Sequence, residues 1–228
     1  MTPAPPSSTE TARPHRHPTP MRLRKKHPLA IRWFHWVNFP LLFLMIWSGI
    51  LIYWAWPEYA GVKLEQTTWR ALKINNRLAE GMALHFFFMW LFGVNGVLYV
   101  LYTWISGEWR ELLPKRGTLR EAWHVLLHDL RIRREPLPRK KFNGAQQLAY
   151  TTVIVMGAGS LLSGLAIYKP VQFAWLAWLF GGYQGARFVH FWLTVGYVAF
   201  FTIHIAQVVR AGWNNFRAMV IGVEATHE

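Results

Sequence analysis

The chain contains no cysteine among its 228 residues. This absence excludes disulfide bonds, iron–sulfur clusters held by thiolates, c-type haem attached through thioethers, and zinc sites built on cysteine. Any redox centre must therefore be ligated by other side chains, and the 10 histidines are the available ligands.

Acidic residues are also scarce, with 11 Asp and Glu against 25 Lys and Arg, for a formal net charge of +14. A basic balance often indicates nucleic-acid binding. Here the cations cluster beside long apolar segments, and the chain holds 14 Trp, a residue that favours membrane interfaces. These features favour a membrane protein in contact with lipid and argue against a nucleic-acid partner.

No cleavable signal peptide is evident, because residues 1–20 are rich in Pro, Ser and Thr and lack an apolar stretch. We expect residues 1–24 to be a disordered cytoplasmic tail and residues 218–228 a second cytoplasmic tail. The membrane domain should then occupy residues 25–217, with its first apolar run acting as an uncleaved anchor.

Four apolar segments are each long enough to cross a hydrocarbon core, which requires roughly 20 residues. They cover about residues 29–56, 78–105, 147–168 and 186–213. The predicted fold class is an all-α membrane protein, a four-transmembrane-helix bundle that binds two b haems. Lys and Arg concentrate before the first segment, between the second and third, and after the fourth, which predicts a bacterial inner-membrane protein with both termini cytoplasmic.

Two shorter segments are expected to lie along the membrane surfaces. Thr118 and Glu121 have capping-box spacing and open an amphipathic stretch, which predicts a helix on the cytoplasmic surface. Residues 171–180 contain two Trp but are too short to span, so we place them at the outer interface.

Four histidines fall inside the predicted spans, at positions 35, 85, 190 and 204. An ionisable residue at such depth is costly and indicates a functional site, although a single one could equally be hydrogen-bonded across helices. With the predicted orientation, His35 and His204 lie at the inner depth, and His85 and His190 lie at the outer depth. The four residues therefore form two pairs.

The spacing on the fourth span suits two metal centres. His190 and His204 are 14 residues apart, which corresponds to about 21 Å along a helix and to side chains that point in nearly the same direction. Two facing imidazoles supply both axial ligands of a haem iron, whereas zinc would need about four ligands at one point. The sequence therefore predicts two haem b, with His35 and His204 ligating one iron and His85 and His190 the other.

Arg32 and Arg187 each precede a predicted ligand by three residues. A guanidinium can pair with an anionic haem propionate in bidentate fashion. The alternative is an ordinary interfacial arginine whose head reaches toward the lipid headgroups, and the sequence does not separate the two roles.

The chain resembles the di-haem cytochrome b subunits of membrane-bound formate dehydrogenases and nickel–iron hydrogenases, a bacterial cytochrome b561-like group that includes thiosulfate reductase cytochrome b. The resemblance covers about residues 25–216. It rests on the following features: Arg32-Trp-Phe-His35-Trp36, His85, the pair His190 and His204, and the segment from Lys141 through Asn143 and Gln146 to Tyr150.

That resemblance implies an electron-transfer subunit. In such proteins the outer haem exchanges electrons with a periplasmic molybdenum, iron–sulfur or hydrogenase subunit, and the inner haem lies beside a quinone, menaquinone or ubiquinone. It also implies a quinone-pocket role for Asn143, for which a helix cap at the start of the third span is the equal alternative. Two other functions stay open at this point: a stand-alone quinone-coupled oxidase of a small periplasmic donor such as superoxide, and a transporter that uses the histidines as a proton relay.

Overall fold

The computed structural model describes residues 21–56, 58–59, 62–63, 65–132 and 142–227. Four long helices dominate it: α1 (Leu29–Tyr53), α3 (Leu78–Ile105), α6 (Gly144–Tyr168) and α8 (Gly182–Ile221). All four are long and apolar enough to cross a membrane. The chain is a helical membrane protein, as predicted. The main difference is that α8 extends beyond both predicted ends of the fourth span.

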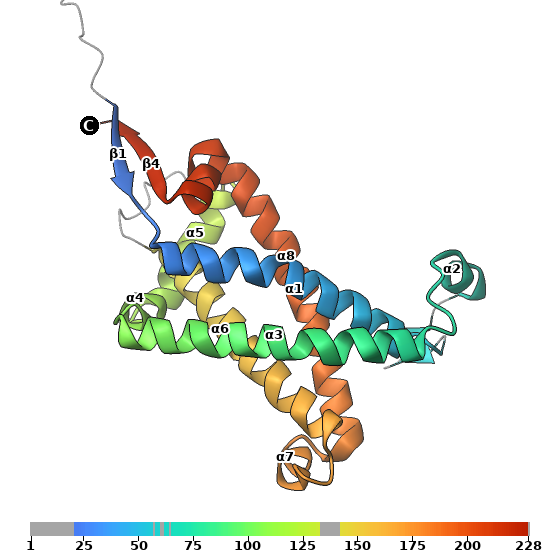
Figure 1. Cartoon of the computed structure of the whole chain (residues 1–228). Helices are drawn as coiled ribbons and strands as arrows, with labels where there is room; N and C mark the ends of the chain where they lie inside the picture. Colours follow the sequence, from blue (N-terminus) through green and yellow to red (C-terminus); the bar gives the residue numbers. More distant parts are fainter. Residues whose placement is uncertain (1–20, 57, 60–61, 64, 133–141, 228) are drawn as a thin grey trace, which may run out of the picture.

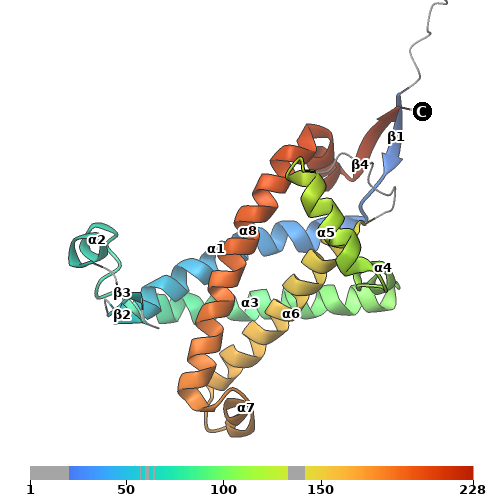
Figure 2. The ribbon, with the colours of Figure 1, turned by 180° about the vertical axis from the view of Figure 1, so that it is seen from behind.

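The long helices are arranged as two pairs. α1 packs closely along α3, and α6 packs against α8, while direct contact between α1 and α8 is sparse. The two pairs cross each other at a wide angle in both views (Figure 1, Figure 2). Consequently α8 approaches the first pair mainly through its side chains.

The α1–α3 pair is held by close backbone approach and by a buried amide. A Cβ placed on Gly81 would lie 2.7 Å from the Cβ of Leu51 and 3.1 Å from the carbonyl oxygen of Ser48. Further along the pair, the buried Asn95 Nδ2 donates to the Phe34 carbonyl at 3.3 Å. Small residues permit such close packing where no hydrophobic effect operates between helices in lipid.

Short elements lie at the two ends of these pairs. The end where α1 and α6 finish, called the α7 end, carries β2 (Glu58–Tyr59), β3 (Val62–Lys63), α2 (Gln66–Ala71) and α7 (Ala174–Leu179). The opposite end, called the sheet end, carries β1 (Met21–Lys25), α4 (Trp109–Leu112), α5 (Thr118–Asp129) and β4 (Val223–His227).

Helix α5 is the predicted surface helix, but it does not begin with the predicted capping box. Gly117, at a positive φ of 89°, precedes the helix, and Thr118 is its first residue. The Thr118 hydroxyl donates to Oε1 of the buried Gln147 at 3.0 Å and accepts from the Lys115 backbone N–H at 2.8 Å. The capping-box prediction at Thr118 and Glu121 is therefore wrong, because the threonine hydroxyl bridges to α6 instead.

A capping box is present at the start of α6. The Asn143 Oδ1 accepts from the Gln146 backbone N–H at 2.9 Å, and the Asn143 N–H donates to the Gln146 Oε1 at 3.0 Å. Both donors would otherwise lack a partner at the helix start. Asn143 therefore has the capping role that the sequence left as one of two alternatives.

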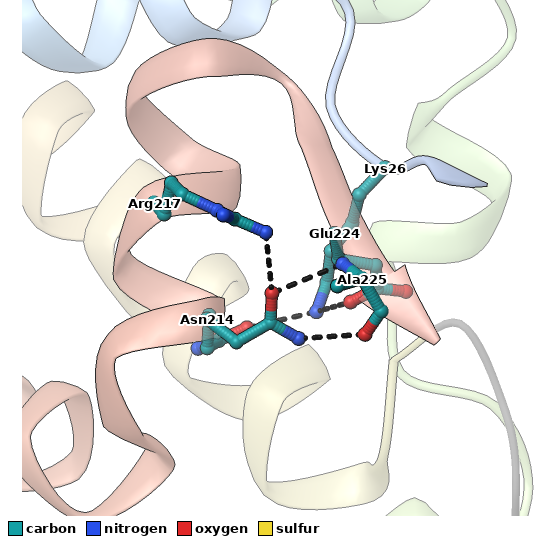
Figure 3. A network of polar contacts seen from close by, with 6 residues as sticks. Lys26, Asn214, Arg217, Glu224 and Ala225 are labelled. Carbon is teal, nitrogen blue, oxygen red and sulfur yellow. Dashed lines mark hydrogen bonds and ion pairs between the residues drawn. The ribbon is translucent and has the colours of Figure 1, made fainter. Parts of the chain in front are cut away.

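The sheet end is closed by a clasp formed by β1, β4 and the last turns of α8. β1 and β4 pair antiparallel, with Leu23 opposite Ala225. Gly212, at φ 79° and ψ 173°, breaks the helical geometry of α8, in a region of backbone conformation open mainly to glycine. The turns beyond it fold back toward β4, where Asn214 Nδ2 donates to the Ala225 carbonyl at 2.8 Å and Lys26 donates to Glu224 at 2.6 Å (Figure 3).

This clasp contains the described parts of the two predicted tails. Residues 21–24 belong to β1, and residues 218–227 complete α8 and form β4, so these parts have defined secondary structure. A hydropathy profile does not reveal this pairing, because both strands are short and polar. The two strands are also separated by nearly the whole sequence. Residues 1–20 lie outside the described residues.

The glycine contact between α1 and α3 predicts a stability difference. Gly81→Ala should destabilise the protein by roughly 1–3 kcal/mol, because the new methyl group must displace backbone and Cβ atoms of α1. Gly96→Ala is the matched control on the same helix, since no other side chain or backbone atom of the described residues lies within 4 Å of its Cβ position. Thermal unfolding in detergent measures both variants, and equal melting temperatures would contradict the packing.

The strand pairing can be tested by cross-linking, because the chain has no native cysteine. The variant with Leu23→Cys and Ala225→Cys should form a disulfide under mild oxidation, since directly opposed residues fall within the range of Cα separations that a disulfide spans. The control with Arg24→Cys and Ala225→Cys places the thiols on opposite faces of the ribbon. Equal cross-linking of the two variants, seen as a gel shift, would contradict this register.

Candidate functional site

The first pair of predicted ligands lies toward the sheet end. His35 on α1 and His204 on α8 face each other with ring centroids 6.2 Å apart and an interplanar angle of 56°. The His204 ring stacks on Phe200 at 5.9 Å and 8°, and the His35 ring meets Trp36 edge-on at 5.1 Å. Aromatic side chains thus fix the orientation of both imidazoles.

The second pair lies toward the α7 end. His85 on α3 and His190 on α8 have ring centroids 6.1 Å apart at 74°. Nδ1 of His85 lies 2.9 Å from the Ser48 hydroxyl, and Nδ1 of His190 lies 3.0 Å from the Ser163 hydroxyl. The structure thus brings together the two histidine pairs that depth along the helices predicts.

Glycines leave room beside the second pair. A Cβ placed on Gly49 would lie 3.8 Å from Cε1 of His85, and one placed on Gly164 would lie 3.3 Å from Cε1 of His190. Each glycine directly follows the serine that contacts the same imidazole. In both helix pairs, a Ser–Gly dipeptide on the first long helix therefore contacts the histidine of the second long helix.

The ring separations fit an iron between each pair of imidazoles. Metal–imidazole bonds of about 2 Å on opposite sides of one metal put the two nitrogens about 4 Å apart, which places the ring centroids about 6 Å apart. The observed 6.2 and 6.1 Å match this geometry. No cluster of three or more His, Cys, Asp or Glu that could hold a metal occurs among the described residues, so a zinc-type site finds no support there.

Helix α8 carries one member of each pair. Its geometry stays helical from His190 to His204 and departs only later, at Gly212. The intervening 14 residues correspond to a rise of about 21 Å. One rigid element therefore fixes the distance between the two candidate sites.

The two predicted propionate partners lie at opposite ends of the helices. Arg32 is engaged in the clasp, where Nη1 donates to the Val220 carbonyl at 2.7 Å, while its buried Nε has no hydrogen-bond partner in the described part of the chain. At the α7 end, Arg187 Nη1 donates to Gln184 Oε1 at 3.2 Å, and its guanidinium lies 5.8 Å from the Tyr183 ring centroid.

Asn143 lies at the sheet end, where it begins α6. The capping box uses its backbone N–H and its Oδ1, so the amide Nδ2 stands outside the box. Capping by one side-chain atom and donation to a ligand by the other are thus geometrically compatible.

The sequence reasoning did not identify Ser48 and Ser163. Serines are common in membrane helices, and their hydroxyls often bond only to their own backbone. The signal that could have found them is the repeated Ser–Gly dipeptide, which precedes the contacted histidine by 37 residues in one case and 27 in the other.

Two comparisons with known proteins show the family of this chain. The model of the family described as prokaryotic cytochrome b561 matches residues 26–222. The chain is also similar to the putative protein-methionine-sulfoxide reductase subunit YedZ1 of Azospira oryzae, with 33% identity over 183 residues, covering 80% of this chain and 89% of the relative. The matched segment contains all four facing histidines and all four spans, and the chain therefore belongs to the prokaryotic cytochrome b561 family of membrane electron-transfer proteins.

Proposed function

We propose that this chain moves electrons across the membrane through two b-type haems, between a quinone at the sheet end and a periplasmic oxidoreductase at the α7 end. His35 and His204 would ligate one haem, and His85 and His190 the other. The observation that carries the proposal is the equal ring separation of the two imidazole pairs, 6.2 and 6.1 Å, on one continuous helix.

The bound haems would supply reversible one-electron chemistry, and the protein would supply ligation and position. Two imidazoles would hold each haem, and such a ligand set favours electron transfer over binding of an exogenous ligand. The guanidinium groups of Arg32 and Arg187 would be suited to pair with anionic propionates at the two ends. A separation near 21 Å between His190 and His204 along α8 would keep two haems held there close enough for electron tunnelling.

The direction of the chain across the membrane follows from its charges. Lys and Arg are most numerous in the segments at the sheet end, including the long connection between α3 and α6. The positive-inside pattern places that end in the cytoplasm. In a bacterial inner membrane, both described ends of the chain would then be cytoplasmic, and α7 would lie at the periplasmic face.

The α7 end suits contact with a partner. Lys63, Arg70 and Lys73 are exposed there and can attract an acidic protein surface by long-range steering. The YedZ1 relative is named as a subunit of a sulfoxide reductase. Because a reductase consumes electrons, this likeness favours outward flow, from quinol at the cytoplasmic side to a periplasmic reductase.

Haem content tests the ligand assignment. The purified chain should contain about two haems with a low-spin b-type spectrum, and His190→Ala or His204→Ala should each reduce the content to about one, since each removes one axial ligand. His128→Ala on α5 is the matched control and should retain both haems. Full haem content in the His190→Ala variant would overturn the assignment.

The role of Asn143 in quinone binding can be separated from its role as a cap. Asn143→Asp preserves the capping oxygen but removes the amide donor, whereas Asn143→Ala removes both and should cost about 1 kcal/mol of stability. If Nδ2 donates to the quinone, both variants should slow reduction of the haems by a quinol analogue. A normal rate in the Asp variant, measured by anaerobic stopped-flow absorbance, would leave Asn143 as a cap alone.

Purification from native membranes tests the identity of the periplasmic electron donor or acceptor. Co-purification of a larger oxidoreductase subunit with the chain is the expected result. Quinone reduction by the isolated chain with superoxide as donor, and without any protein partner, would instead support the stand-alone oxidase function.

A further inference from the structure

The two histidine pairs differ in what their second ring nitrogens contact. At the α7 end, Ser48 and Ser163 lie 2.9 and 3.0 Å from the Nδ1 atoms of His85 and His190. At the sheet end, Nδ1 of His35 is buried and has no hydrogen-bond partner among the described residues. The two sites are therefore chemically unlike, although their ring separations are nearly equal.

The direction of the serine hydrogen bonds follows from the number of hydroxyl hydrogens. Each serine has one hydroxyl hydrogen, which it donates to a backbone carbonyl one turn earlier in the helix. Ser48 donates to the Leu44 carbonyl at 2.7 Å, and Ser163 donates to the Gly159 carbonyl at 2.7 Å. The hydroxyl oxygen must then accept from the imidazole, so Nδ1 carries the proton. This tautomer leaves Nε2 of both rings unprotonated and available to a metal.

Burial makes these two hydrogen bonds persistent. Ser48 and Ser163 are both 0% exposed, so water cannot compete for the hydroxyl oxygen. A hydroxyl that itself donates to a carbonyl is also a stronger acceptor, because consecutive hydrogen bonds polarise one another. The imidazoles at the α7 end are therefore permanently polarised through Nδ1.

An acceptor on the distal nitrogen of a ligating imidazole makes that imidazole a more basic ligand. A more electron-donating ligand stabilises the more highly charged, oxidised iron, and hydrogen bonding around a haem is one of the means by which a protein sets its potential. The pair with two such acceptors should accordingly favour the oxidised state more than the pair in which His35 has none.

We propose that Ser48 and Ser163 are positioning residues that set the midpoint potential of the haem at the α7 end below that of the haem at the sheet end. The proposal rests on the proposed function, since it requires both haems. For outward flow, electrons would then move from the haem of higher midpoint potential to the haem of lower midpoint potential, which is unfavourable, and toward the electrically positive side of an energised membrane, which is favourable. The rate of outward transfer should therefore depend on an energised membrane.

Redox titration of the purified chain tests this proposal. The wild type should titrate in two waves, and Ser48→Ala and Ser163→Ala should each shift the lower wave to higher potential, with a larger shift in the double variant. The upper wave should stay in place. The His204→Ala variant, which keeps only the haem at the α7 end, assigns the lower wave to that site. Thr202→Val is the matched control, because the Thr202 hydroxyl on α8 donates to the Val198 carbonyl at 2.9 Å.

If an alanine variant loses haem, conservative variants that retain it can still test the effect of the serine on the midpoint potential. Ser48→Thr retains a hydroxyl and should keep the wild-type potential, while Ser48→Cys offers a weaker acceptor and should raise the lower wave. An unmoved lower wave in haem-replete alanine or cysteine variants would overturn the proposal, as would a shift of the upper wave. Failure of the proposed function is distinguishable, because the unmodified chain would then contain fewer than two haems.

Discussion

The structure depends on two gaps of equal width between opposed imidazole rings. The ring centroids are 6.2 Å apart in one pair and 6.1 Å in the other, a separation that one metal ion between the rings would fit. Because His190 and His204 share α8, this helix must stay straight between them and cross the α1–α3 pair without packing tightly on it. The sparse direct contact between α1 and α8, and the position of the helix break at Gly212, beyond His204, both agree with that requirement.

The two helix pairs share one contact between a serine and a histidine. In each pair the first helix supplies a Ser–Gly dipeptide, and the second supplies the histidine that the serine contacts. The repetition ends there, because α1 also carries His35 and α8 carries His204, whereas α3 and α6 contribute no histidine at the sheet end. The Ser–Gly contact is therefore repeated in both helix pairs, whereas the histidines are not distributed equally over the helices. The histidine pair at the α7 end has serine contacts, and the pair at the sheet end is built differently.

Much of this arrangement can be predicted from sequence, for identifiable physical reasons. A hydrocarbon environment forces continuous apolar helices, so the spans are visible in hydropathy, and depth along them pairs His35 with His204 and His85 with His190. Contacts that depend on helix rotation and on distant partners are not visible in this way. The Ser48 and Ser163 hydrogen bonds, the bridge from Thr118 to Gln147, and the β1–β4 pairing all belong to this second class.

The placement of His190 and His204 on the last long helix also constrains how the protein is made. Neither imidazole pair can exist until α8 has entered the membrane, so α1 and α3 must be inserted while His35 and His85 lack their partners. Capture of a cofactor between these histidines must then follow synthesis of α8, and the β1–β4 clasp can close only once β4, which follows α8, has also been made. A nascent chain that stalls before α8 would contain three membrane spans and no bis-histidine site, which gives the cell a simple chemical difference between finished and unfinished copies.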